Sequence, residues 1–222
     1  MNAINQTNNG DNSDLTRNLP YPEKSALVGY EVNELISRRW STRAFDENRP
    51  VERHKILSLL EAARWAPSCF NEQPWRYLVF DNSNVEALHR ARACLIGFNS
   101  WAHKAPVLML SVARDSFTSN GNPNRHAQHD VGLASQNLVL EAVHQGLAAH
   151  QMGGFDIERA RREFNIPKGF MPMAMMAIGY AYRGQPDELP GMLRSMETEA
   201  RQRRAIREIA FAGKWSQPYE KL

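Results

Sequence analysis

Two nearly continuous apolar runs constrain the fold of this chain more than any other feature. Residues 106–113 read Pro-Val-Leu-Met-Leu-Ser-Val-Ala, and residues 173–180 read Met-Ala-Met-Met-Ala-Ile-Gly-Tyr. A strand with one face in water alternates apolar and polar residues, whereas a run without alternation is typical of a strand covered on both faces. The sequence therefore predicts a sheet that lies between two layers of other elements.

Helical patterns surround these runs and supply the covering layers. The clearest begins at Glu52, where apolar residues recur at helical spacing from Ile56 to Ala63, and it ends before Pro67. Further helices are expected over 31–39, 85–96, 130–149 and 155–165 (with Asp156 as N-cap), and the basic segment 197–211 is expected to be helical at first. A third strand is expected over 75–80 and a loop over 116–128. Helices and strands mixed in this order, with too few strands for a doubly wound sheet, indicate an α+β fold.

The longest predicted helix, 130–149, is apolar on most of its sides. Val131, Ala134, Leu138 and Ala142 mark one face, and other leucines and valines line the rest. Such a helix is expected to be buried, either in a large core or between subunits.

Length, charge and cysteine content indicate how many domains the chain forms and which kinds of partner it is expected to have. The 222 residues fit one domain or one subunit of an intertwined oligomer, and a net charge of +3 does not by itself indicate nucleic-acid binding. Residues 1–22 are polar and Asn-rich and are expected to form a disordered leader, which leaves 23–222 as a single domain. Two isolated cysteines, no secretion signal and no apolar stretch long enough for a bilayer predict a cytoplasmic protein without a membrane partner.

Two polar clusters flank the helix that begins at Glu52. Residues 39–43, Arg-Trp-Ser-Thr-Arg, offer two guanidinium groups and a hydroxyl, which is chemistry suited to gripping a phosphate bidentately. Residues 67–74, Pro-Ser-Cys-Phe-Asn-Glu-Gln-Pro, set short hydrogen-bonding side chains between two prolines, so their backbone is expected to be stiff. Together the clusters predict a site for an anion and a ring.

At these clusters the sequence resembles the nitroreductase family of FMN-dependent oxidoreductases. The resemblance is carried by Arg-Arg-x-Ser-x-Arg-x-Phe at 38–45 and Glu-Ala-Ala-Arg-x-Ala-Pro-Ser-x-x-Asn-x-Gln-Pro-Trp at 61–75. Gly-Phe-Asp at 154–156, Ile-Gly-Tyr at 178–180 and a basic segment over 203–215 are similar to later family motifs, in the expected order. The resemblance implies a three-layer α-β-α sandwich with a mixed or antiparallel sheet. It also implies a homodimer in which the C-terminal arm of one subunit extends the sheet of the other.

The same resemblance implies which residues bind the cofactor. Those holding the FMN phosphate and reaching toward the pyrimidine end of the ring would be Arg39, Trp40, Ser41 and Arg43, with Arg203 closing on the phosphate and Arg204 as its alternative. Those reaching the FMN of the partner subunit would be Pro67, Ser68 and Asn71, and those passing close to the ring would be Met152, Gly153 and Gly154.

Each assignment has an ordinary structural alternative. Residues 39–43 could be a solvated basic loop, Asn71 a cap for its own turn, and Gly153 with Gly154 a flexible helix end. Trp40 and Gly153 depart from the commoner family residues. Cys69 stands where the family often has a second serine and is expected to be a small buried hydrophobe. No catalytic side chain is assigned.

The implied activity is hydride transfer from NADH or NADPH through flavin N5 to a nitroaromatic, quinone or similar acceptor, with ping-pong kinetics. Two alternatives remain open: another FMN reaction on the same fold (reductive dehalogenation, flavin fragmentation or heterocycle oxidation), and a non-enzymatic basic binding module. His126 and His129 have the spacing of a metal site, but no further ligand cluster accompanies them in the sequence, so no metal is expected.

Overall fold

A four-stranded antiparallel sheet forms the centre of the structure, a computed structural model that describes residues 24–219. The strands lie in the order β1 (Trp75–Phe80), β2 (Val107–Arg114), β4 (Phe170–Gly179) and β3 (Ala148–Met152). The two strands predicted from their apolar runs, β2 and β4, are the central pair. The predicted leader, residues 1–22, lies outside the described residues.

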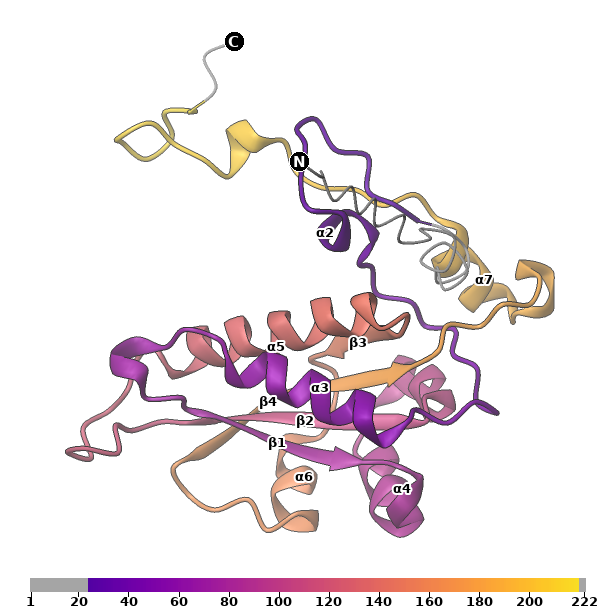
Figure 1. Cartoon of the computed structure of the whole chain (residues 1–222), viewed down its shortest axis with the longest axis horizontal. Helices are drawn as coiled ribbons and strands as arrows, with labels where there is room; N and C mark the ends of the chain where they lie inside the picture. The colour runs from indigo at the N-terminus through magenta and orange to yellow at the C-terminus, as the bar shows by residue number, and fades with distance from the viewer. Residues whose placement is uncertain (1–23, 220–222) are drawn as a thin grey trace, which may run out of the picture.

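Helices cover both faces of this sheet (Figure 1). One face packs against α3 (Arg53–Arg64) and α5 (Ala127–His144), and the other against α4 (Val85–Ala93), η3 (Gly97–Lys104) and α6 (Ile157–Glu163). Along β2, Met109 joins the first core while Leu108 and Leu110 join the second. The α+β fold and the three-layer α-β-α sandwich are therefore confirmed, with an entirely antiparallel sheet over the described residues.

Pro172 lies inside the central strand β4 rather than before it. The pairing of β4 with β2 shifts register at this point, because Ser111 faces Ala174 while Val112 faces Pro172. Such a bulge adds one unpaired residue and allows a proline, which has no N–H to donate, within a strand.

The predicted helix 130–149 is wrong at its C-terminal end. α5 ends at His144, and Gly146, with a φ of 71°, donates its N–H to the carbonyl of Val143. Leu147 then donates to the carbonyl of Ala142, which completes a Schellman motif. The next residues form the edge strand β3, because pairing with β4 outweighs the helix propensity of its alanines.

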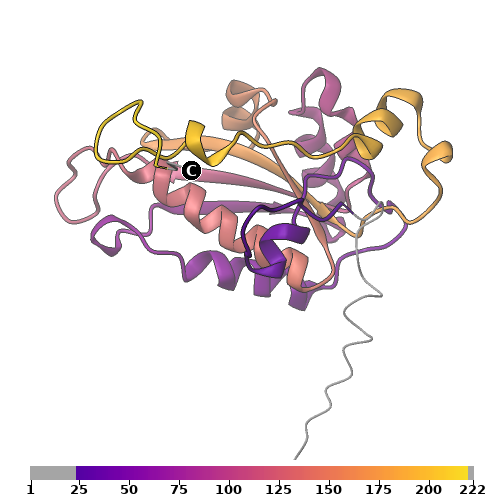
Figure 2. The ribbon, with the colours of Figure 1, turned by 90° about the horizontal axis from the view of Figure 1, so that it is seen from above.

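The segment 197–211 was predicted to be helical at first, but only its first two residues belong to a helix, at the end of α7 (Gly191–Thr198). Residues 199–219 form a C-terminal arm that contains the short 3-10 helix η5 (Ile206–Glu208). Figures 1 and 2 show the arm running along the side of the molecule that carries α5. The remaining short elements are α2 (Glu34–Arg38), η1 (Cys69–Asn71), η2 (Asn82–Asn84) and η4 (Pro186–Glu188).

The predicted N-cap of α6 is confirmed, since the Asp156 carboxylate accepts a hydrogen bond from the N–H of Arg159 at 2.8 Å.

A pair of truncations in α4 tests the packing of the second layer. Leu88 is 1% exposed, so Leu88→Ala should cost about 2–5 kcal/mol of unfolding free energy through lost burial and a residual cavity. Val85, on the same helix, is 66% exposed, and Val85→Ala should cost less than about 1 kcal/mol. Urea unfolding at one fixed protein concentration measures both. Equal costs would contradict the inward orientation of Leu88.

Candidate functional site

The basic cluster predicted from the sequence lines a single pocket of about 230 Å³, here called the basic pocket. Of the residues predicted to bind phosphate, the pocket brings together Arg39, Trp40, Ser41, Arg43 and Arg203. Its other lining residues are Lys24, Met196, Glu199, Ala200 and Arg201. Arg204, the alternative to Arg203, does not line it. Four arginines and a lysine thus face one carboxylate, which leaves an excess of positive charge.

Electrostatics in the basic pocket favour an anion. Burial, together with the charges of Arg201 and Arg203, lowers the pKa of Arg39. The Arg39 guanidinium donates a hydrogen bond from Nη1 to Ser41 Oγ at 3.2 Å, so the two side chains converge. A phosphate placed among these donors would relieve the repulsion between the guanidinium groups and accept charge-assisted hydrogen bonds.

Arg201 holds the start of the C-terminal arm against this pocket. Its guanidinium donates to the backbone carbonyls of Lys24 and Ser37, both at 2.6 Å, and of Arg39 at 2.9 Å. Sequence reasoning did not single it out, because nothing distinguishes it from the neighbouring arginines. Through these bonds the arm brings Arg203 beside Arg39.

The peptide between Thr42 and Arg43 is held by two buried side chains that sequence reasoning missed. Glu197, fully buried in the last turn of α7, accepts hydrogen bonds from the N–H of Arg43 and the hydroxyl of Thr42, each at 2.7 Å. His150, on β3, places Nδ1 at 2.9 Å from the carbonyl oxygen of Thr42. Since that oxygen can only accept, Nδ1 carries the proton. Burial raises the pKa of Glu197 and lowers that of His150 to about 4.

The second cluster, residues 67–74, forms a constrained loop, here called the proline loop. Phe70, Asn71 and Gln73 all have positive φ, between 51° and 56°. The Cys69 N–H donates to the carboxylate of Asp130 at 3.0 Å, and Asp130 is 3% exposed at the start of α5. This buried carboxylate, which was not predicted, keeps the loop in place while the side chains of Pro67 and Asn71 are exposed and Ser68 is half-buried.

Within the chain, the two clusters do not come together. The proline loop lies at the end of α3 far from residues 39–43 (Figure 1), and the helix between them has 12 residues, a length of about 18 Å. Pro67, Ser68 and Asn71 therefore stay outside the basic pocket of their own subunit.

The third predicted group, Met152 to Gly154, spans the end of β3, whose last residue is Met152. Met152 is 4% exposed and belongs to the core, so it presents little surface to a ligand. A side chain at Gly154 would lie 2.5 Å from Nδ2 of buried Asn99, which donates to the Gly154 carbonyl. Nothing lies within 4 Å of the Cβ position at Gly153, which therefore leaves open space. Both glycines follow a strand, which corrects the alternative of a flexible helix end.

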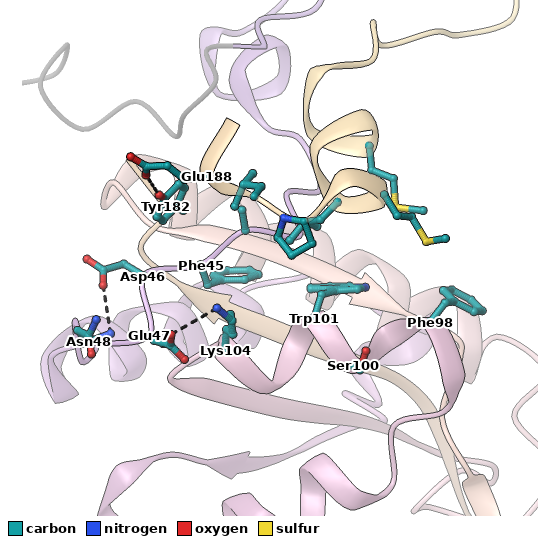
Figure 3. A pocket seen from close by; sticks show the side chains of 16 residues that line it. Phe45, Asp46, Glu47, Asn48, Phe98, Ser100, Trp101, Lys104, Tyr182 and Glu188 are labelled. Atoms are coloured by element: carbon teal, nitrogen blue, oxygen red, sulfur yellow. Dashed lines mark hydrogen bonds and ion pairs between the residues drawn. The ribbon is translucent and has the colours of Figure 1, made fainter. Parts of the chain in front are cut away.

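A larger cavity of about 560 Å³ is lined by residues 44–48 and by residues of α7 and η3 (Figure 3). Phe45 and Trp101 stack there with ring centroids 6.2 Å apart. Phe98, Ser100, Trp101 and Lys104, all from η3, line it. The cavity contains none of the predicted cofactor-binding residues, although Met196 lines both it and the basic pocket.

Within residues 24–219, no three histidine, cysteine, aspartate or glutamate residues are grouped to hold a metal ion. His129 instead lies 3.3 Å from the Asp130 carboxylate. Among the helices described, none is long and apolar enough to span a bilayer.

Comparisons with known proteins show a family and a fold that this chain shares. Residues 36–180 match the model of the nitroreductase family. A protein of Methanothermobacter thermautotrophicus, named as a candidate NADH dehydrogenase/NAD(P)H nitroreductase, is 30% identical over 166 residues, covering 72% of this chain and 80% of that protein. The NADH dehydrogenase of Thermus thermophilus is 28% identical over 198 residues, covering 73% and 93%. A crystal structure described as an oxidoreductase containing FMN is 32% identical with a TM-score of 0.79, covering 86% of this chain and 96% of that one.

The buried imidazole predicts a pH dependence of stability. The pKa of His150 is about 4 in the folded protein, against an ordinary value of 6.5, with burial as the main cause and the charges of Arg43 and Arg39 adding to it. Between pH 4 and pH 6.5, His150 is therefore protonated in the unfolded chain but neutral in the folded protein. Stability should therefore fall as pH drops from about 6.5 toward 4, by on the order of 3 kcal/mol at most.

His150→Asn is the matched control, because its amide keeps a donor for Thr42 but does not titrate. Urea unfolding at pH 7 and pH 5 should show a smaller loss in this variant than in the wild type. Equal losses would contradict a buried neutral His150.

Proposed function

This chain belongs to the nitroreductase family, and from that premise we propose that it is an FMN-dependent oxidoreductase that uses NADH or NADPH to reduce a small acceptor such as a nitroaromatic or a quinone. The observation that carries the proposal is the basic pocket, where Arg39, Ser41, Arg43 and Arg203 converge. Their donors fit a phosphate ester better than a carboxylate, because several charged groups surround one small space.

The chain's own residues divide the work of binding. FMN, when bound, supplies hydride transfer between the nicotinamide and the acceptor. Arg39, Arg43 and Arg203 would hold its phosphate, with Ser41 adding a neutral hydroxyl. The open space at Gly153 leaves room for a flat ring beside the end of β3. Positive charge from this cluster would also stabilise negative charge that develops on the reduced ring.

A homodimer would complete the site. Asn71, exposed on the proline loop, carries two donors and an acceptor that suit the mixed edge of a flavin, but it does not line the basic pocket of its own chain. The C-terminal arm exposes Ile209 (67%), Trp215 (85%) and Tyr219 (72%), a series of apolar side chains that a partner subunit would cover. These features support a dimer in which each subunit adds its proline loop to the other's cofactor.

The visible absorption spectrum of the purified protein, followed by anaerobic addition of NADH or NADPH, tests the proposal. Flavin bands that bleach on addition of a nicotinamide are expected. Flavin bands that persist would keep the cofactor but favour a different FMN reaction. A protein that carries no flavin and takes up none when FMN is supplied would overturn the proposal.

Arginine variants test the phosphate site separately. Arg43→Ala should weaken FMN binding about 10- to 100-fold, because a hydrogen bond to a charged group contributes about 1.5–3 kcal/mol. Binding of riboflavin, which lacks the phosphate, should change little. Arg204→Ala is the matched control, since Arg204 lies outside the basic pocket. Fluorescence titration of cofactor-free protein measures the affinity of each variant, and of the wild type, for FMN and for riboflavin. Equal effects of the two variants on FMN affinity would contradict the assignment of Arg43 to the phosphate site.

A further inference from the structure

Residues 39–44 alternate between half-buried and buried positions. Trp40, Thr42 and Ala44 are 6%, 0% and 3% exposed, whereas Ser41 and Arg43 are half-buried and line the basic pocket, which Trp40 also borders. An extended backbone sends successive side chains to opposite sides, so the orientation of one peptide decides where the side chains next to it point. In this segment, the peptide that sets these directions is the buried one between Thr42 and Arg43.

Both polar groups of that peptide are bound by side chains from distant elements. Its carbonyl accepts a hydrogen bond from His150 on β3, and its N–H donates to Glu197 on α7. Because the peptide unit is planar, fixing both groups fixes its rotation, and with it the directions of the flanking side chains. We propose that Glu197 and His150 are positioning residues for the cofactor phosphate, which hold this peptide so that Ser41 and Arg43 face the basic pocket. The proposal rests on the proposed FMN function and names residues that act on the cofactor through the backbone.

The carboxylate of Glu197 suits this role because it accepts two hydrogen bonds at once. One oxygen serves the Arg43 N–H and the other the Thr42 hydroxyl. A glutamine can replace both bonds, since its amide oxygen accepts from Arg43 and its amide nitrogen donates to Thr42 Oγ1. The Thr42 hydroxyl would then donate to the Ala44 carbonyl, already 3.3 Å away. A methionine of similar size would leave the Arg43 N–H without its partner.

The imidazole of His150 is fixed by its surroundings. Its ring centroid lies 4.5 Å from that of Trp101, which in turn stacks on Phe45. The donor atom Nδ1 is therefore held toward Thr42 by packing on the other side of the ring. An asparagine can present an amide N–H from a similar position, whereas a leucine cannot.

The readout is the ratio of FMN affinity to riboflavin affinity. A general loss of packing would lower both affinities and leave this ratio unchanged. In Glu197→Met, FMN affinity should fall about 10-fold or more, as expected when a group that positions charged donors is lost, while riboflavin affinity stays within about 3-fold. Glu197→Gln should keep the wild-type ratio of the two affinities. Leu193→Ala is the control for damage to α7, because Leu193 is a half-buried residue of the same helix that does not line the basic pocket. It should lower stability without changing the ratio.

Amide hydrogen exchange in cofactor-free protein provides a readout independent of flavin. The peptide spanning residues 40–45 should exchange faster in Glu197→Met and His150→Leu than in the wild type. Glu197→Gln and His150→Asn should leave its protection unchanged. This measurement tests the hold on the peptide even if the protein binds no flavin at all.

The outcomes separate the two proposals. If wild-type protein binds neither FMN nor riboflavin, the proposed function fails, and the exchange experiment alone decides whether the peptide is held. If the wild type binds both but folded Glu197→Met keeps the wild-type ratio, the positioning role is overturned. Equal loss of FMN and riboflavin affinity would also overturn it, since that pattern indicates a general structural role.

Discussion

With both faces of β2 and β4 packed against helices, the centre of the sheet offers no surface to a ligand, and binding groups are confined to the segments at its edges and ends. The basic pocket is built in this way from the segment between α2 and α3, the end of α7 and the arm that follows α7. Those segments have no ladder of their own to fix them. Their geometry therefore depends on individual hydrogen bonds to buried side chains.

Two buried carboxylates serve this purpose in the same manner. Glu197 accepts the N–H of Arg43 beside the basic pocket, and Asp130 accepts the N–H of Cys69 in the proline loop. A buried carboxylate without partners would be costly, so each is stable only while its loop stays in place. The two candidate binding loops are consequently rigid before any ligand arrives, which reduces the entropy lost on binding.

The sequence was sufficient for features that depend on local pattern. Nearly continuous apolar runs identified β2 and β4, and the basic cluster at 39–43, predicted to grip a phosphate, contributes Arg39, Ser41 and Arg43 to one pocket. The sequence was insufficient where contacts between residues far apart in the chain decide the local structure. Ala148 and Ala149, the first residues of β3, were predicted to end a helix because alanine favours helix, and pairing with β4 makes them a strand. Glu197 and His150 lie 154 and 108 residues from their backbone partners, and no local pattern connects them.

The central claim is that FMN binds with its phosphate in the basic pocket of one subunit and its ring reached by the proline loop of the other. A crystal structure of the protein with FMN tests it most directly. The account predicts the phosphate within hydrogen-bond distance of Arg39 and Arg43, and Asn71 of the partner subunit at the ring. Flavin bound instead in the 560 Å³ cavity beside Phe45 and Trp101, with the basic pocket empty, would contradict it.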